Sequence, residues 1–137
     1  MDRIAHKVEI PLPPAEVFKA LNDAKALGAL MPGVAGTTGE TTRPKRLAMG
    51  AQFELMTSKG EAVSATVIEH VPNRSCAIED AKGVRSRWVC VPMKDGRTLL
   101  TNEILGHFGP DKAAKLETET VDRMTEFVAA RLASRKR

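Results

Sequence analysis

The sequence predicts an α+β fold in which helices cover one face of an antiparallel sheet. Three observations support this: a strand and two short helices open the chain, a series of hairpin-linked strands follows, and one long helix closes it. Strands joined by short turns pair antiparallel, and helices then bury their apolar sides against one face of the sheet. We therefore expect about six or seven strands, two short helices and a long C-terminal helix in a single domain over residues 1–137.

The first 33 residues hold the clearest local signals. Residues 7–10 alternate polar and apolar side chains, which is typical of a strand with one buried face. The Pro-Pro pair at 13–14 ends that strand and fits the first turn of a helix, where a missing N–H costs little. Apolar residues recur at helical spacing over 17–21, and Asn-Asp at 22–23 ends this helix. A second short helical turn then leads to a Pro-Gly stop at 32–33.

A series of strand patterns follows a Gly/Thr-rich loop or weak strand over 33–46. Each pattern is rich in alternating or β-branched residues and is bounded by turn residues. The turn at Asp95-Gly96 is the strongest of these signals, because Asp-Gly supplies the positive φ that a tight hairpin turn needs. The predicted strands cover residues 50–59, 61–71, 75–79, 84–93 and 97–108.

The last segment changes to a helical period. Asp111 can cap a helix there, acidic residues occupy the first half, and Arg and Lys end it, as the helix dipole favours. A helix of about 24 residues is roughly 36 Å long at 1.5 Å per residue. Its apolar side consists of Leu116, Val121, Met124, Phe127, Val128 and Leu132.

Composition limits the classes of protein to which the chain can belong. Its 42% hydrophobic and 28% charged residues are ordinary for a soluble globular domain. No apolar run is long enough to span a bilayer, and no apolar segment precedes a signal-cleavage site. We therefore expect a cytoplasmic protein with no integral membrane association.

Charge and cysteine content add further limits. The net charge of +4 is modest, and the one dense basic run, residues 131–137, is interpreted as a solvated helix end. With no Tyr, one Trp and four Phe, the chain cannot build a base-stacking platform, so no nucleic-acid partner is expected. Cys76 and Cys90 lack the spacing of a metal site or a disulfide framework and are interpreted as reduced, partly buried thiols. Whether they meet across neighbouring strands stays open.

Four short motifs are informative when taken together. They are Val17-Phe18-Lys19-Ala20-Leu21-Asn22-Asp23, Met31-Pro32-Gly33, the set Val67, Glu69 and Pro72, and the set Asp95, Gly96 and Thr98. With the order of elements, they resemble the SRPBCC superfamily of START-related, polyketide cyclase/dehydrase-like and birch-pollen-allergen-like proteins. The resemblance implies the helix-grip fold, a curved sheet wrapped around the C-terminal helix. The N-terminal segment is also similar to a group of carbon monoxide dehydrogenase subunits whose members assist a larger enzyme.

The helix-grip architecture suggests a ligand cavity. A strongly curved sheet and one helix do not close fully, so either large side chains fill the gap or a pocket remains. The chain has few aromatics but six Met, which suit adaptable apolar surfaces, although a filled core stays an alternative. The resemblance implies an entrance near residues 27–34, where residues 28–33 form a lid or an ordinary tight turn. The residues expected to bind a ligand are Leu30, Met31, Phe53, Leu55, Trp88, Val121, Met124 and Val128.

The strand that contains Trp88 has two registers. In one, Trp88 faces the interior and both Arg85 and Arg87 face outward. In the other, an arginine enters the cavity, where it could pair with a ligand carboxylate. We expect Trp88 to face inward, because burying an unpaired arginine is costly.

The sequence contains no motif of a known catalytic site. A carboxylate or imidazole that faces the interior could act as a general base, but solvated side chains are the alternative. The histidines lack the spacing of a metal site, and we expect no catalytic residue, no metal and no cofactor. The residues considered were His6, His70, His107, Glu54, Glu69 and Glu103.

Three functions follow from this interpretation. The first is non-catalytic binding of a small, largely apolar molecule such as a lipid, in a carrier or sequestering role. The second is a polyketide cyclase/dehydratase-like enzyme that uses an inward Glu or His, although family enzymes often place Tyr in the cavity and this chain has none. The third is an accessory protein for a larger enzyme, which would have a protein partner. A monomer or a homodimer is expected.

Overall fold

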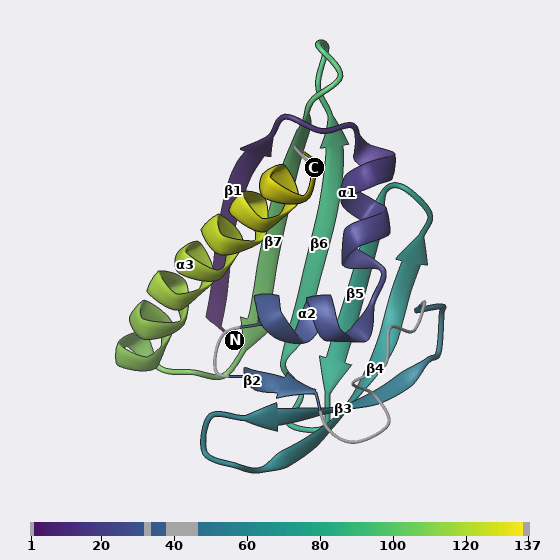
Figure 1. The fold of residues 1–137 in the computed structure, drawn as a ribbon. Coiled ribbons are helices and arrows are strands. Elements are labelled where there is room, and N and C mark those ends of the chain that lie inside the picture. The colour runs from purple at the N-terminus through teal and green to yellow at the C-terminus, as the bar shows by residue number, and fades with distance from the viewer. Residues whose placement is uncertain (1, 32–33, 38–46, 136–137) are drawn as a thin grey trace.

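The computed structural model describes residues 2–31, 34–37 and 47–135, and its elements follow the predicted order. The strands are β1 (Asp2–Ile10), β2 (Val34–Thr37), β3 (Gln52–Thr57), β4 (Ala62–Val71), β5 (Ser75–Asp80), β6 (Arg85–Pro92) and β7 (Thr98–Gly106). The helices are α1 (Pro14–Leu21), α2 (Ala24–Leu30) and α3 (Pro110–Arg135). The expected α+β helix-grip fold is confirmed (Figure 1).

The strands form one seven-stranded sheet in the order β1-β7-β6-β5-β4-β3-β2. Every neighbouring pair is antiparallel, and the first strand pairs with the last along its whole length, from Asp2 opposite Gly106 to Ile10 opposite Thr98. The register shifts between Val67 and Glu69. Figure 1 shows that the sheet is curved, with β3 and β2 turning across its lower end beneath α2.

Several boundaries differ from the sequence prediction, and two of the differences have a clear physical reason. The first strand begins at Asp2 rather than near residue 7, because its pairing with β7 continues past the alternating segment. Helix α3 begins at Pro110, one residue before the predicted cap Asp111, which lies in the first turn. Proline is favoured at that position, since its missing N–H has no helical partner there.

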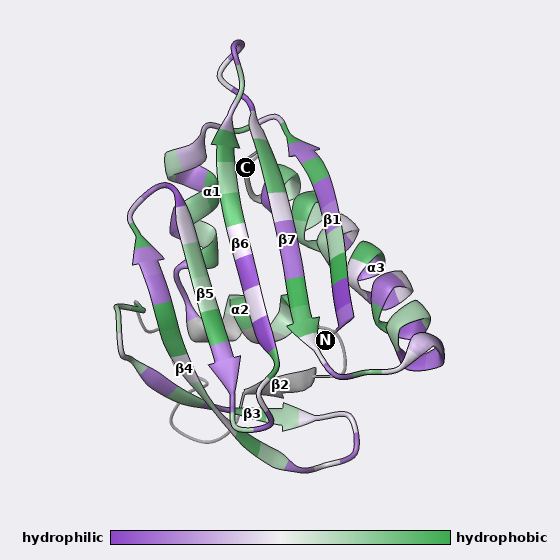
Figure 2. Cartoon of the chain, turned by 180° about the vertical axis from the view of Figure 1, so that it is seen from behind, coloured by the Kyte–Doolittle hydropathy of each residue, from purple (hydrophilic) through white to green (hydrophobic). Residues whose placement is uncertain are grey.

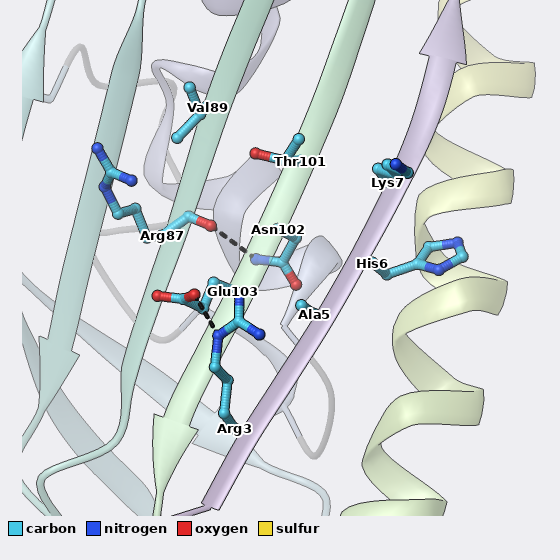
Figure 3. A pocket seen from close by; sticks show the side chains of 9 residues that line it. All are labelled: Arg3, Ala5, His6, Lys7, Arg87, Val89, Thr101, Asn102 and Glu103. Atoms are coloured by element: carbon cyan, nitrogen blue, oxygen red, sulfur yellow. Dashed lines mark hydrogen bonds and ion pairs between the residues drawn. The ribbon is translucent and has the colours of Figure 1, made fainter.

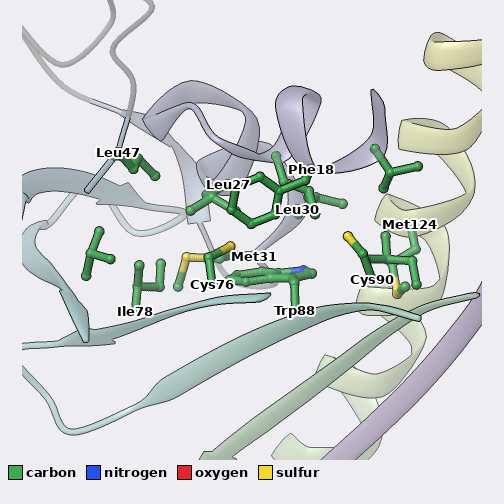
Figure 4. Close-up of a cluster of buried hydrophobic side chains, with 14 of the residues drawn as sticks. Phe18, Leu27, Leu30, Met31, Leu47, Cys76, Ile78, Trp88, Cys90 and Met124 are labelled. Carbon is green, nitrogen blue, oxygen red and sulfur yellow. The ribbon is translucent and has the colours of Figure 1, made fainter. Parts of the chain in front are cut away.

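The core lies between the inner face of the sheet and the helices. Along β6, Ser86, Trp88 and Cys90 are buried, while Arg85 and Arg87 are exposed on the opposite face. The inward register of Trp88 is therefore the one observed. Figure 4 shows its ring lying flat on the sheet beneath Phe18, Leu27 and Leu30, which come from α1 and α2.

The outer face of the sheet carries charged pairs. Arg3 on β1 pairs with Glu103 on β7 at 2.5 Å, and Arg87 on β6 pairs with Glu69 on β4 at 2.9 Å. Figure 2 shows this face from behind, with the three helices on the far side of the sheet. Exposed ion pairs of this kind stabilise a sheet only modestly.

Helix α3 lies across β1 and beside α2, at the edge of the core. Only Met124 and Thr120 on the described part of this helix are buried, and Phe127 and Val128 pack against the core while half-buried. The predicted apolar stripe is therefore less covered than a central helix would be, and one side of α3 remains open toward α1 and α2.

Candidate functional site

Most of the eight residues predicted to line a cavity form packed core. Leu30, Met31, Phe53, Leu55, Trp88 and Met124 are all 4% exposed or less and belong to one cluster of buried side chains. Val121 and Val128 are half-buried on α3. Figure 4 shows Met31 and Cys76 on one side of the Trp88 ring, with Cys90 and Met124 on the other. In the described part of the chain, the six buried residues pack against one another in this cluster.

An open pocket lies above this core, between the α1–α2 pair and the C-terminal half of α3. It measures about 400 Å³, which is within the range of small-molecule sites. We call it the interhelix groove. Its lining residues are Ala20, Asp23, Ala26, Ala29, Leu30, Arg123, Glu126, Phe127, Ala130 and Arg131.

The lining of the interhelix groove is apolar at its base and charged at its rim. Half-buried Phe127 presents apolar surface from α3, and Leu30 of α2, which is almost fully buried, lies at the base. Four of the lining residues are alanines, whose small side chains leave room for a ligand. Concave apolar sites with a few polar groups are typical of small-molecule binding.

One arginine holds the two sides of the groove together. Arg123 on α3 donates from Nη1 to the backbone oxygen of Ala29, 3.2 Å away, and from Nη2 to Glu119, 2.9 Å away. Ala29 lies in the last turn of α2, where backbone oxygens lack helical partners. This contact links the end of α2 to α3 across the groove.

A second, smaller pocket of about 130 Å³ opens on the other side of the α2 terminus. It lies between the sheet and the first turns of α3, and Met31 is the residue of the predicted site that it contains. Met31 directly follows Leu30, which lines the interhelix groove, so the end of α2 separates the two pockets. The lining residues are Met31, Thr57, Asp80, Lys82, Val84, Ser86, Ile104, Phe108, Lys112 and Leu116.

A third pocket, of about 450 Å³, lies along β1, β7 and β6 (Figure 3). Two of its cations already have partners, because Arg3 pairs with Glu103 and Arg87 with Glu69. Figure 3 also shows His6 directed toward α3 and away from the Arg3–Glu103 pair. We therefore interpret this hollow as part of the charged sheet surface and not as the ligand site.

The carboxylates considered as general bases lie away from the interior. Glu54 is exposed between two inward residues of β3, and Glu69 and Glu103 pair with arginines on the outer face. A hydrogen bond from Ser75, and then the guanidinium of Arg87, lower the pKa of Glu69. A lowered pKa is opposite to the raised pKa that a carboxylate base at neutral pH needs. None of these three carboxylates therefore suits acid–base catalysis inside the fold.

The three histidines do not converge. His70 is half-buried, forms a 2.9 Å hydrogen bond with Asn22 and meets the ring of Phe18 edge-on, so its contacts are structural. His6 is half-buried on β1, and His107 is exposed after β7. Across the described ranges, no three His, Cys, Asp or Glu side chains gather as a metal site would require.

Sequence reasoning missed Arg123 and Arg131 as groove residues. The stripe Arg123, Phe127 and Arg131 recurs every four residues, which places all three on one side of α3. That spacing was available in the sequence, but the basic end of the helix was interpreted as solvated. Of the predicted lid, Pro32 and Gly33 fall outside the described residues. The predicted entrance near 27–34 includes Leu30 and Met31, which line the two pockets.

Comparisons with known proteins relate the chain to one family and to several solved structures. A family model described as polyketide cyclase / dehydrase and lipid transport matches residues 1–136. The chain resembles the Aha1 dimer of Colwellia psychrerythraea with a TM-score of 0.72 and 16% identity, over 95% of this chain and 96% of that chain. It resembles protein MLL2253 of Mesorhizobium loti with a TM-score of 0.70 and 17% identity, over 97% and 98% of the two chains.

A catalytic relative shares the same fold. A point mutant of Thalictrum flavum norcoclaurine synthase, in complex with a transition state analogue, matches with a TM-score of 0.65 and 14% identity, over 99% of this chain and 96% of that chain. TM-scores of 0.65 to 0.72 show a common fold. No curated protein sequence matches the chain. In the ranges that the structure describes, no helix is both long and apolar enough to cross a membrane.

Proposed function

Because the chain belongs to the polyketide cyclase / dehydrase and lipid transport family of the SRPBCC superfamily, we propose that it binds a small, largely apolar molecule in the interhelix groove. The protein would carry or sequester this molecule without changing it chemically. The observation that carries the proposal is an apolar groove of about 400 Å³ that opens directly above a packed interior.

The packed interior supports the groove as the site. A ligand placed among Trp88, Phe53 and Leu55 would have to displace side chains that already fill the core, at a cost in stability. A ligand in the groove would cover Phe127 and Leu30 without moving them. Each methylene that it buries there would contribute about 0.8 kcal/mol, so affinity should rise with the length of an apolar chain.

The positions of the acidic residues support a non-catalytic role. Of the carboxylates that were candidates for a base, Glu54 is exposed, and Glu69 and Glu103 pair with arginines on the outer face of the sheet. Ala20, Ala26, Ala29 and Ala130 contribute no acid or base to the groove. Its charged residues suit orientation of a bound molecule, as the few polar groups of an apolar pocket usually do.

A second candidate, an accessory role for a larger enzyme, is favoured by the filled interior. A protein segment could cover the same groove, and the likeness of the N-terminal segment to the assisting subunits of carbon monoxide dehydrogenase stays a prediction. Binding of a small molecule by the isolated protein distinguishes the two roles, because only the carrier role requires it.

Filling the groove tests the carrier role. Ala130→Trp places a large side chain in the groove from an exposed position on α3, so the fold should tolerate it. We expect the affinity for the neutral fluorescent probe N-phenylnaphthylamine to fall by about tenfold or more. Probe fluorescence, which rises on transfer from water to an apolar site, measures the dissociation constant.

The neighbouring variant Ala129→Trp is the matched control. Ala129 is also exposed and lies on the same helix, but it does not line the groove. It should leave probe binding unchanged. Wild-type protein that fails to bind the probe, or equal losses in both variants, would rule out the groove as the ligand site.

Location and assembly are also proposed. We propose a cytoplasmic location, which is supported by two buried free cysteines in the described chain. For the oligomeric state, we still predict a monomer or a homodimer, and one structural relative is a dimer.

A further inference from the structure

The arginines of the described chain differ in their partners. Most pair with a carboxylate: Arg3 with Glu103, Arg85 with Glu79, Arg87 with Glu69, Arg97 with Asp95 and Glu9, and Arg123 with Glu119. Arg131 is half-buried along the interhelix groove, and within the described ranges the structure gives its side chain no ion pair. A guanidinium presents a planar set of N–H donors that matches a carboxylate.

The position of Arg131 in the groove defines a polar end. Arg123 and Arg131 are eight residues apart on α3, so their backbones are separated by roughly 12 Å along the helix. Phe127 lies midway between them. Arg123 already donates to Ala29 and Glu119, whereas the donors of Arg131 are directed to no described partner. Along the groove, the guanidinium of Arg123, which has partners, is therefore followed by the apolar side chain of Phe127. The guanidinium of Arg131, which has no ion pair in the described chain, comes last.

We propose that Arg131 binds the carboxylate of a single-chain amphiphile whose apolar chain lies over Phe127 and Leu30. This inference rests on the proposed function, because it assigns the ligand class of the same groove. Charge-assisted, bidentate hydrogen bonds to a carboxylate are stronger and more directional than those between neutral groups. Such a contact would orient the ligand, while burial of its chain would supply most of the affinity.

The acidic residues of the groove limit the charge of the ligand. Asp23 and Glu126 also line it, so a doubly charged head group would meet more repulsion than a single carboxylate. Glu126 is exposed and stays hydrated, whereas Arg131 is half-buried and more weakly hydrated. The arginine is therefore the better anchor for a single carboxylate.

Decanoate and decanol test this assignment, because they share a chain and differ in charge at neutral pH. Each is titrated against bound N-phenylnaphthylamine, and displacement gives its affinity. Arg131→Gln should weaken decanoate binding by about tenfold, since a hydrogen-bonded ion pair is lost, and leave decanol unchanged. Arg131→Lys keeps the charge without the bidentate geometry, so the loss should be intermediate. Glu126→Gln should strengthen decanoate binding.

Arg74→Gln is the control. Arg74 is exposed between β4 and β5 and lines none of the three pockets described above, so its loss should not alter either affinity. An equal effect of Arg131→Gln on both ligands, or no effect on either, would overturn the assignment while leaving the groove as the site. Wild-type protein that binds neither ligand would overturn the proposed function itself.

Discussion

Replacing Trp88 with alanine is expected to lower the free energy of unfolding by about 3–5 kcal/mol. The side chain is 1% exposed and is among the largest fully buried residues of the described chain. Its ring spans the inner face of β6 beneath α1 and α2, with sulfur-containing side chains on both sides (Figure 4). Truncation removes this apolar area and leaves a cavity that the rigid sheet cannot close. Urea denaturation followed by circular dichroism measures the change, since the variant lacks the only tryptophan.

Val91→Ala on the same strand is the control for Trp88. Val91 is 39% exposed and faces outward, so its truncation should cost far less. A loss of less than about 1 kcal/mol for Trp88→Ala would contradict a filled interior, because it would mean that the ring does not support the core. That outcome would restore the internal cavity that the sequence led us to expect.

The two cysteines of the folded protein are expected to resist alkylation below pH 9. Burial, and then the nearby Cys90 and Glu69, raise the pKa of Cys76 from 9.0 to about 12, and burial raises that of Cys90 to about 11. The thiolate is the reactive form. Compared with a thiol of pKa 9.0, the thiolate fraction at neutral pH should therefore be lower by about a thousandfold for Cys76 and about a hundredfold for Cys90. Iodoacetamide labelling followed by mass spectrometry measures the rate.

Alkaline pH should destabilise the fold for the same reason. Between pH 9 and the raised pKa values, the thiols of the unfolded chain lose their protons while those of the folded chain keep them. The unfolded state then binds fewer protons, so the free energy of unfolding falls as the pH rises above 9. The absence of Tyr leaves thiolate absorbance free of tyrosinate. The variants Cys76→Ala and Cys90→Ala show which thiol loses its proton at which pH. Rapid labelling of the native protein would contradict the buried placement of the cysteines.

Much of the fold could be predicted because local signals and pairing agree. The Asp95-Gly96 turn and the alternation around Trp88 fix adjacent antiparallel strands, and the observed β6 and β7 pair across that turn. The inward register of Trp88 followed from the cost of burying Arg87. The length of β1 could not be predicted, because residues 2–6 are held by pairing with distant β7 and not by a local pattern.

The site was harder to predict than the fold. Sequence periodicity identified Trp88 and Met124 as inward residues, and the family resemblance placed Leu30 near the entrance. A buried residue, however, looks the same in the sequence whether it packs against a neighbour or lines a cavity. Only the packing of side chains distinguishes the two cases, and here they form one core. Arg131 lines the groove because α2 lies beside α3, and the hydrophobic periodicity of a single helix does not predict how two helices pack.

The measurement that tests the central claim most directly is a two-dimensional amide NMR titration of the isotope-labelled protein with decanol. The account predicts that the largest shifts cluster on the walls of the interhelix groove, at Ala26, Ala29, Phe127, Ala130 and Arg131. It also predicts small shifts on the outer strand positions of Arg3 and Arg87. Shifts confined to the sheet interior around Trp88 and Phe53, or no shifts at saturating decanol, would contradict the claim that this groove binds an apolar molecule.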